Sequence, residues 1–299
     1  SIVSLHKSAG NTEQSLATIE RMRALLGRDD PTIDLEQIEL LRGLGKRREA
    51  LQAARTARER FPQQNEFLYL EAFILTDSGQ VDEAVTLLRA RLSKPGATGT
   101  ASSTTLADFE LYLRIASLYT QANRGTEGVA AARQALERAP ADRADMMTAA
   151  LITLSSAQER AGDAKGSEDS LRRVLDRDPD NATALNNLGY FLVERGERLK
   201  EALELIQRAV KAEPTNSSFL DSLGWAYFKL GQLEEAAQHL SDAARRDSSS
   251  ATIQEHLGDV YHRQGKKDLA RAAWQKALSL TVEADEIARL KAKLGGNVK

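Results

Sequence analysis

The sequence predicts an all-α fold, a solenoid of stacked antiparallel helix pairs. Two observations indicate this fold. First, a two-helix pattern recurs along the 299 residues with a period of about 34 residues. Second, Ala, Leu, Glu and Arg abound while aromatic residues make up only 5% of the chain, which is a helical composition. A fixed period of this length indicates units that bury their apolar faces against their neighbours.

The two clearest copies of the pattern begin at Ser217 and Ala251. Aligned on these starts, they share identical residues: Leu223 with Leu257, Gly224 with Gly258, Tyr227 with Tyr261, Gly231 with Gly265, Ala236 with Ala270, and Ala243 with Ala277. The conserved spacing of i, i+3, i+4 and i+7 in the first helix defines one helix face. A glycine then ends that helix, and the small residues Gly224 and Ala236 permit the two helices to cross closely.

Seven repeats of this kind are predicted over residues 31–282. They start near positions 31, 65, 109, 148, 182, 217 and 251, and residues 1–30 are expected to hold a partial repeat. Prolines recur at the phase where a second helix should stop, at Pro62, Pro140, Pro179 and Pro214. A run of Gly, Ser and Thr without periodicity predicts a loop insertion near residues 95–106. The repeat that starts near 109 is also longer than the usual period, and its additional residues lie around 141–147.

Residues 283–299 are predicted to form a capping helix and a tail. Ile287 and Leu290 would supply its apolar face, while Arg289, Lys291 and Lys293 would keep its outer face soluble. Such a helix suits the end of a solenoid, where no further repeat covers the last apolar face.

The repeated residues resemble the tetratricopeptide repeat: Leu, Gly and Tyr in the first helix, Gly at the turn, Ala in the second helix, and Pro at the close. The resemblance covers roughly residues 31–282 and is strongest from residue 148 onward. It implies a right-handed superhelix whose first helices line a concave groove that binds extended peptides or partner helices. The stretch from Ala182 to Trp225 also resembles repeats of bacterial envelope proteins, often outer-membrane lipoproteins.

In this family, the fifth, ninth and twelfth residues of each repeat face the concave groove. In this sequence these positions include the predicted partner-binding residues Asn186, Tyr190, Asp221, Trp225, Phe228, Glu255, Asp259 and His262. They would present an aromatic floor beside an acidic end, which favours a basic or amide-rich peptide. The alternative is that the aromatic side chains pack between neighbouring first helices and are never free. In the N-terminal half the same positions hold Leu35, Glu39, Arg42, Tyr69, Phe73 and Thr76.

No catalytic residues and no cofactor are predicted, because no nucleophile and base occur in a supporting context. Glu255, Asp259 and His262 share a helix face, but without a fourth ligand they fit a solvated surface better than a metal site. The formal net charge of −2 without a basic stripe argues against nucleic-acid binding. No apolar run is long enough for a membrane span, so any membrane link would come from an upstream anchor.

We therefore expect a non-enzymatic scaffold or adaptor that binds a partner protein or peptide. The alternatives are an architectural spacer that self-associates, or a regulatory segment of a larger enzyme or envelope complex. Because the chain opens at Ser1 inside a half-finished helical pattern, further upstream sequence is expected. A bacterial periplasmic or outer-membrane location is the first hypothesis for the compartment, and the cytoplasm is the second.

Overall fold

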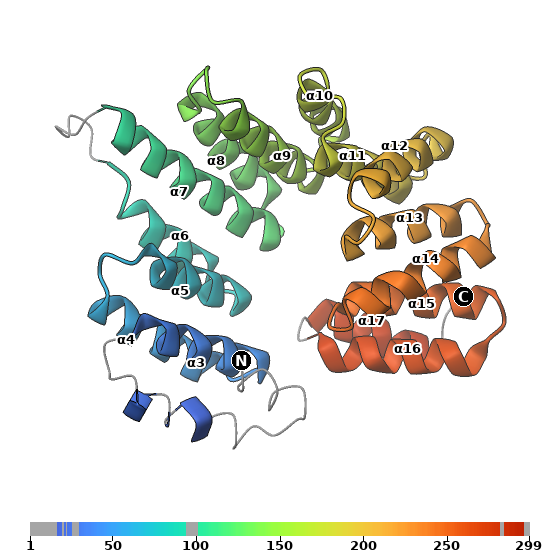
Figure 1. Cartoon of the computed structure of the whole chain (residues 1–299), viewed down its shortest axis with the longest axis horizontal. Helices are drawn as coiled ribbons and strands as arrows, with labels where there is room; N and C mark the ends of the chain where they lie inside the picture. The colour runs from blue at the N-terminus through green and yellow to red at the C-terminus, as the bar shows by residue number, and fades with distance from the viewer. Residues whose placement is uncertain are drawn as a thin grey trace. The chain divides into compact units, whose positions relative to one another are not determined.

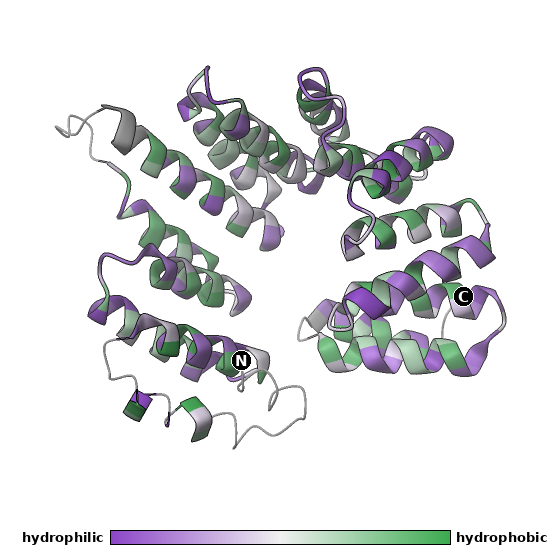
Figure 2. Cartoon of the chain, viewed as in Figure 1, coloured by the Kyte–Doolittle hydropathy of each residue, from purple (hydrophilic) through white to green (hydrophobic). Residues whose placement is uncertain are grey.

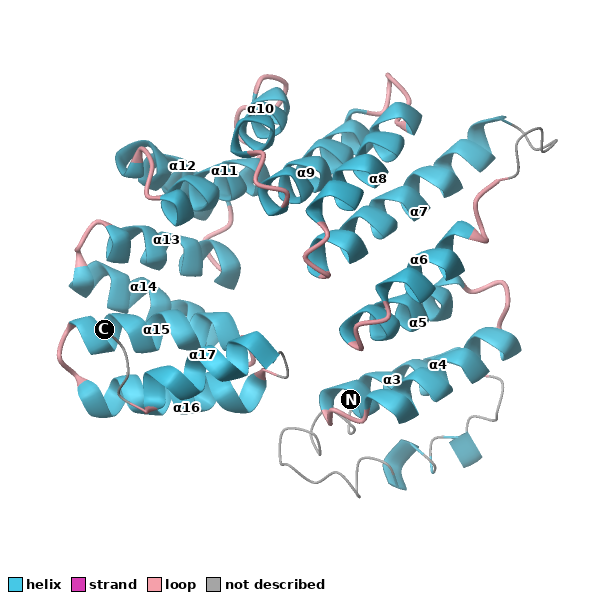
Figure 3. Cartoon of the chain, turned by 180° about the vertical axis from the view of Figure 1, so that it is seen from behind, coloured by secondary structure: helices cyan, strands magenta, loops and turns pink. Residues whose placement is uncertain are grey.

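The computed structural model describes residues 17–19, 21, 23–25, 30–93, 101–281 and 284–295. Within these ranges the chain consists of helices joined by short loops, without a strand (Figure 3). Polar and apolar residues alternate along the helices (Figure 2), as expected of helices that bury one face. None of the described helices is long and apolar enough to cross a bilayer. The fold class predicted from the sequence is confirmed.

The chain divides into two compact units, residues 1–167 and 168–299, and each is described on its own. The helices of the first unit are α3 (Pro31–Gly43), α4 (Arg47–Arg60), α5 (Asn65–Asp77), α6 (Val81–Arg89), α7 (Ala101–Gln121), α8 (Gly125–Arg138) and α9 (Ala144–Arg160). Each packs against the next along the chain, and α7 also packs against α5 and α9 (Figure 1). The odd-numbered helices are therefore the first helices of successive pairs.

The second unit has the same organisation. The division falls within α10 (Ala164–Leu175), and the helices that follow are α11 (Ala182–Arg195), α12 (Leu199–Ala212), α13 (Ser217–Lys229), α14 (Leu233–Arg246), α15 (Ala251–Arg263), α16 (Lys267–Leu280) and α17 (Ala284–Leu294). From α11 on, each packs against the next, and the first helices α11, α13 and α15 also pack against one another in sequence. Contacts between neighbours only are the hallmark of a repeat array.

Turn residues and small residues set the geometry of each helix pair. Gly231 ends the first helix of its repeat with a φ of 79°, and Asn123 adopts a φ of 60° at the matching turn. Asparagine tolerates this left-handed conformation better than other non-glycine residues. Where the helices cross, a Cβ added to Gly258 would lie 2.4 Å from Cδ1 of Trp274. Only a glycine fits at that crossing without moving the indole.

Two boundaries differ from those predicted. Helix α7 begins at Ala101, inside the loop expected at 95–106. Residues 101–106 contain neither Gly nor Pro, and Leu106 packs beside the buried Phe109, so the helix extends upstream. Helix α9 begins at Ala144, because Met146 joins the same apolar cluster and the surplus residues there continue the helix. Residues 94–100 and most of the predicted partial repeat at 1–30 lie outside the described residues.

Candidate partner-binding surfaces

Trp225, the predicted centre of the aromatic floor, is a packing residue. Its side chain is buried, with 9% of the residue exposed. The indole stacks against Phe228 and His256, with ring centroids 4.7 and 4.1 Å away. Its Nε1 donates a hydrogen bond of 2.5 Å to Oε1 of Glu194. The alternative that this aromatic side chain packs between first helices therefore holds for Trp225.

The side chain of Asp221 is likewise buried in the second unit. Its Oδ1 lies 2.9 Å from Nδ1 of His256, and both side chains are almost buried. Burial lowers the pKa of His256, but the charge and hydrogen bond of Asp221, together with the charges of Asp259 and Glu194, outweigh burial and raise the pKa above its ordinary value. The pair links helix α13 to helix α15.

The acidic end of the predicted groove is neutralised by the chain itself. Arg289 of α17 donates to both carboxylate oxygens of Glu255, at 2.7 and 2.8 Å. Lys293 lies 2.7 Å from Glu255 Oε1 and from both carboxylate oxygens of Asp259. Asp259 also accepts from Nε1 of Trp274 at 2.9 Å. Burial raises the pKa of Glu255, but its hydrogen bonds with Arg289 and Lys293 and the charges of these two residues outweigh burial and lower the pKa to about 2.

This arrangement corrects the sequence-based assignment of α17. Arg289 and Lys293 were expected on the outer face, whereas both pair with carboxylates of α15. The sequence could not place them, because the residues of α17 alone do not show which acids the neighbouring helix presents to it. Leu290 is buried as predicted. No group of three potential metal-ligating side chains gathers within the described residues.

The other predicted groove residues of the second unit reach the surface to different extents. Asn186 is buried, and its Oδ1 has no hydrogen-bond partner among the described residues. Tyr190 is half-buried beside Phe191, with ring centroids 6.3 Å apart. Phe228 is half-buried, whereas His262 is exposed, 5.4 Å from Trp274. Tyr190, Phe228 and His262 are thus the predicted aromatic groove residues that solvent reaches.

The first unit contains two adjoining hollows between its first helices. The hollow between α5 and α7, about 220 Å³, is lined by Tyr69, Ala72, Phe73, Leu88, Arg114, Ser117, Leu118 and Gln121. The hollow between α7 and α9, about 320 Å³, is lined by Ser117, Thr120, Gln121, Ile152, Thr153, Ser156 and Arg160. Because Ser117 and Gln121 line both, we treat the two hollows as one surface, the first-helix groove.

Aromatic rings and guanidinium groups meet in this groove. The guanidinium carbon of Arg114 lies 3.5 Å from the ring centroid of Tyr69, and that of Arg42 lies 4.3 Å from the ring centroid of Phe73. Both contacts are cation–π interactions between neighbouring first helices. Gln121 donates a hydrogen bond of 2.7 Å from Nε2 to Oδ1 of Asp77.

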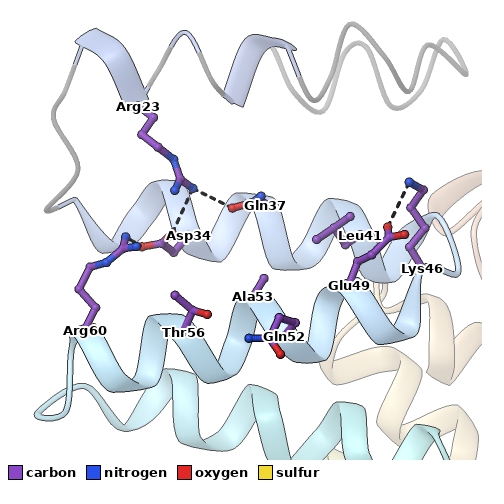
Figure 4. A pocket seen from close by; sticks show the side chains of 10 residues that line it. All are labelled: Arg23, Asp34, Gln37, Leu41, Lys46, Glu49, Gln52, Ala53, Thr56 and Arg60. Atoms are coloured by element: carbon purple, nitrogen blue, oxygen red, sulfur yellow. Dashed lines mark hydrogen bonds and ion pairs between the residues drawn. The ribbon is translucent and has the colours of Figure 1, made fainter.

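A third hollow, about 480 Å³, lies beside α3 and α4 (Figure 4). Its charged side chains pair with one another. The buried Asp34 accepts from Arg23 at 3.1 Å and from Arg60 at 2.9 Å, and Lys46 lies 3.1 Å from Glu49. Each charged side chain that lines this hollow thus has a partner of opposite charge within it, so none of them needs a ligand for pairing.

Comparison with known proteins decides the family. Three sequence models, each described as tetratricopeptide repeat, match residues 147–282, 35–97 and 109–142. The chain is a tetratricopeptide repeat (TPR) protein. The resemblance inferred from the repeated Leu, Gly, Tyr and Ala positions is confirmed.

Similar TPR proteins occur in several bacteria. A TPR repeat-containing protein of Pseudomonas aeruginosa is 32% identical over 187 residues, which cover 62% of this chain and 29% of that protein. The chain thus spans less than a third of that relative. A solved TPR protein from Parabacteroides merdae has a TM-score of 0.61 at 18% identity, covering 91% of this chain and all of the other. A thermophilic TPR protein of Thermus thermophilus has a TM-score of 0.55 at 22% identity, covering 62% and 98%. At these identities the structures show the fold alone.

The TPR register explains which groove residues the sequence did not reveal. Arg114 is the sixth residue of its repeat, and Gln121 and Arg160 are thirteenth residues, whereas only the fifth, ninth and twelfth were considered. On a helix these positions directly follow the predicted stripe and border the same face. A wider stripe would have included them.

Proposed function

We propose that this TPR chain is a non-enzymatic scaffold that binds a partner polypeptide on the face formed by its first helices. TPR proteins are in general protein-interaction scaffolds, which supports the class of function. The observation that carries the proposal is the first-helix groove of the first unit. It is hollow, and exposed polar side chains such as Ser117 and Arg160 line it beside aromatic rings. Such a mixture of aromatic and polar groups is typical of recognition surfaces.

In the second unit the proposal is restricted to residues that solvent reaches. Tyr190, Phe228 and His262 remain candidates for partner contact. Trp225, Asp221 and Glu255 instead stabilise the packing of neighbouring helices, since each is buried and bonded within the unit. Their substitution is expected to alter stability rather than recognition directly.

A selection experiment tests the scaffold proposal. A random library of displayed 12-residue peptides is selected on the whole chain, and the strongest binder is synthesised. Hydrogen exchange is then compared with and without that peptide. Protection of amides on the first helices α5, α7 and α9, or on α11, α13 and α15, is the expected result. Failure to select any binder, or protection confined to second helices, would overturn the proposal.

Sedimentation of the same sample separates scaffold from architectural spacer. A monomer over a wide concentration range is expected for the scaffold. Self-association that rises with concentration would instead favour the architectural role, because repeat arrays that assemble do so through their own surfaces.

A further inference from the structure

The first-helix groove carries positive charge without a matching acid. The residues that line its two hollows include Arg114 and Arg160, and no Asp or Glu among the described residues. The carboxylate of Asp77, which does not line the hollows, accepts a hydrogen bond from the lining residue Gln121. The groove is therefore electropositive across α7 and α9.

Both groove arginines have unused donors. Arg114 and Arg160 are exposed, and neither donates a hydrogen bond or forms an ion pair within the part of the chain that the structure describes. Arg114 is engaged only through the face of its guanidinium, over Tyr69. A stacked guanidinium keeps its edge N–H groups directed outward, where they can bind a carboxylate in a bidentate manner.

Several other arginines of the same unit are neutralised by acids of the chain. Arg55 and Arg58 both bond to Glu71, at 3.0 and 2.6 Å, and Arg124 lies 2.6 Å from Asp82. Arg143 lies 2.7 Å from Asp145. Arg114 and Arg160, by contrast, line the groove without such a partner among the described residues.

Apolar groups lie next to the unpaired charges. Tyr69 and Phe73 line one hollow and Ile152 lines the other, and all three are half-buried. They can accept an aliphatic or aromatic side chain of a ligand. Ser117 and Ser156 also line the groove. Each hydroxyl donates to a carbonyl of its own helix, so its oxygen can still accept from a backbone N–H group of an extended peptide.

We propose that the first-helix groove binds an extended acidic segment of a partner protein, in which Asp or Glu side chains flank an apolar residue. The acidic side chains pair with Arg114 and Arg160, and the apolar residue packs against Tyr69, Phe73 or Ile152. This inference rests on the proposed scaffold function and names the chemistry of its partner. It is opposite in sign to the basic peptide expected from the sequence of the second unit.

The geometry also suggests how far apart the acids lie. Helices α7 and α9 pack directly, and packed helix axes are about 8–10 Å apart. An extended peptide advances about 3.3 Å per residue. Two acidic side chains that reach Arg114 and Arg160 are therefore separated by about three residues or more.

The test uses the peptide selected from the random library and a second version in which every Asp and Glu is replaced by Asn and Gln. Binding of both is measured by fluorescence anisotropy. Selected peptides should be enriched in Asp and Glu relative to the library, and the amide version should bind at least about tenfold more weakly. Binding of the acidic version should weaken as salt is raised, since exposed charges are screened.

Variants of the whole chain then locate the binding. Arg114→Gln and Arg160→Gln should each weaken the acidic peptide by about tenfold and leave the amide version unchanged. Arg133→Gln is the matched control, since Arg133 is an exposed arginine on the second helix α8. Thermal melting of the three variants, which all replace exposed side chains, verifies that each is folded.

The outcomes distinguish this inference from the scaffold proposal. If selected peptides protect first helices but are neither enriched in acids nor weakened by the two groove variants, the acidic partner is refuted and the scaffold function stands. If no peptide binds to any first helix, both are refuted. A peptide enriched in Lys and Arg would also contradict the inference.

Discussion

The docking of α17 on α15 gives the sharpest stability prediction, because one buried carboxylate, that of Glu255, pairs with two cations of α17. Glu255 accepts hydrogen bonds from Arg289 and Lys293. Replacing it by glutamine keeps the size and one acceptor oxygen but removes the charge. Lys293 would keep its contact with Asp259, whereas Arg289, whose side chain is 52% exposed, would return to solvent.

The magnitude follows from the pKa of Glu255. A decrease from 4.5 to about 2 corresponds to an upper bound of ~3.4 kcal/mol, at ~1.4 kcal/mol per pH unit. Since the exposed Arg289 is screened by solvent, we reduce this bound to about 2 kcal/mol. A lowered pKa stabilises the fold above the unfolded value of 4.5, and this stabilisation is lost as the pH falls towards 2.

Because a repeat contacts only its neighbours, the effect should be local. Hydrogen exchange in Glu255→Gln should accelerate on α17 and on the end of α15, by about thirtyfold for 2 kcal/mol, while α11 and α12 stay unchanged. Glu204→Gln, at an exposed position on α12, is the control. If Glu255→Gln accelerates exchange on α17 no more than Glu204→Gln does, the ion pairs do not dock this helix and the reasoning is wrong.

Two further predictions concern the same unit. Gly258→Ala should lower the free energy of unfolding, measured by urea denaturation, by about 1 kcal/mol. Displacing Trp274 costs ~1–3 kcal/mol, which exceeds the gain of up to ~1 kcal/mol in helix propensity. A variant as stable as the wild type would contradict the close crossing. His256 has a raised pKa beside Asp221, so its stabilising effect is present below pH 6.5 and is lost as the pH rises through the folded pKa. Melting temperatures measured from pH 6 to 9 should therefore depend less on pH in Asp221→Asn than in the wild type, and equal slopes would refute the pairing.

The repeat pattern predicted the fold class because each repeated residue has a local role. The left-handed turn glycine, the small residue at the helix crossing and the apolar stripe are all read within one repeat, as at Gly231 and Gly258. The starts of α7 and α9 were misplaced because helix extension depends on a cluster formed by residues of different helices, such as Phe109 and Met146. Such clusters leave no periodic signal in one segment.

The candidate site was harder to predict for the same reason. Groove positions carried over from the family indicate a face but not the partners that the neighbouring helix supplies. Asp221 and Glu255 are both fifth residues of their repeats. Each pairs with a residue two helices further along the chain, Asp221 with His256 of α15 and Glu255 with Arg289 of α17. These positions therefore link repeats in the second unit, although the register of the family assigns them to a groove.

The residue at the fifth position of the repeat also explains why Arg114 of the first unit keeps an unpaired charge. There the residue is Tyr69, and the sixth residue of the next repeat is Arg114, which lies over its ring. At the matching positions of the second unit, Asp221 pairs with His256. A tyrosine attracts the cation without neutralising it, so Arg114 remains available to an acidic ligand.

An acidic residue at position 69 should therefore occupy Arg114 and block the acidic ligand. In Tyr69→Glu the new carboxylate pairs with Arg114, as Asp221 pairs with His256. The acidic peptide should then bind at least as weakly as it does to Arg114→Gln, about tenfold below the wild type, in fluorescence anisotropy. Tyr69→Gln removes the ring without adding charge and is the control for lost apolar contact. If Tyr69→Gln weakens the acidic peptide as much as Tyr69→Glu does, the ring and not the unpaired cation determines binding at this position.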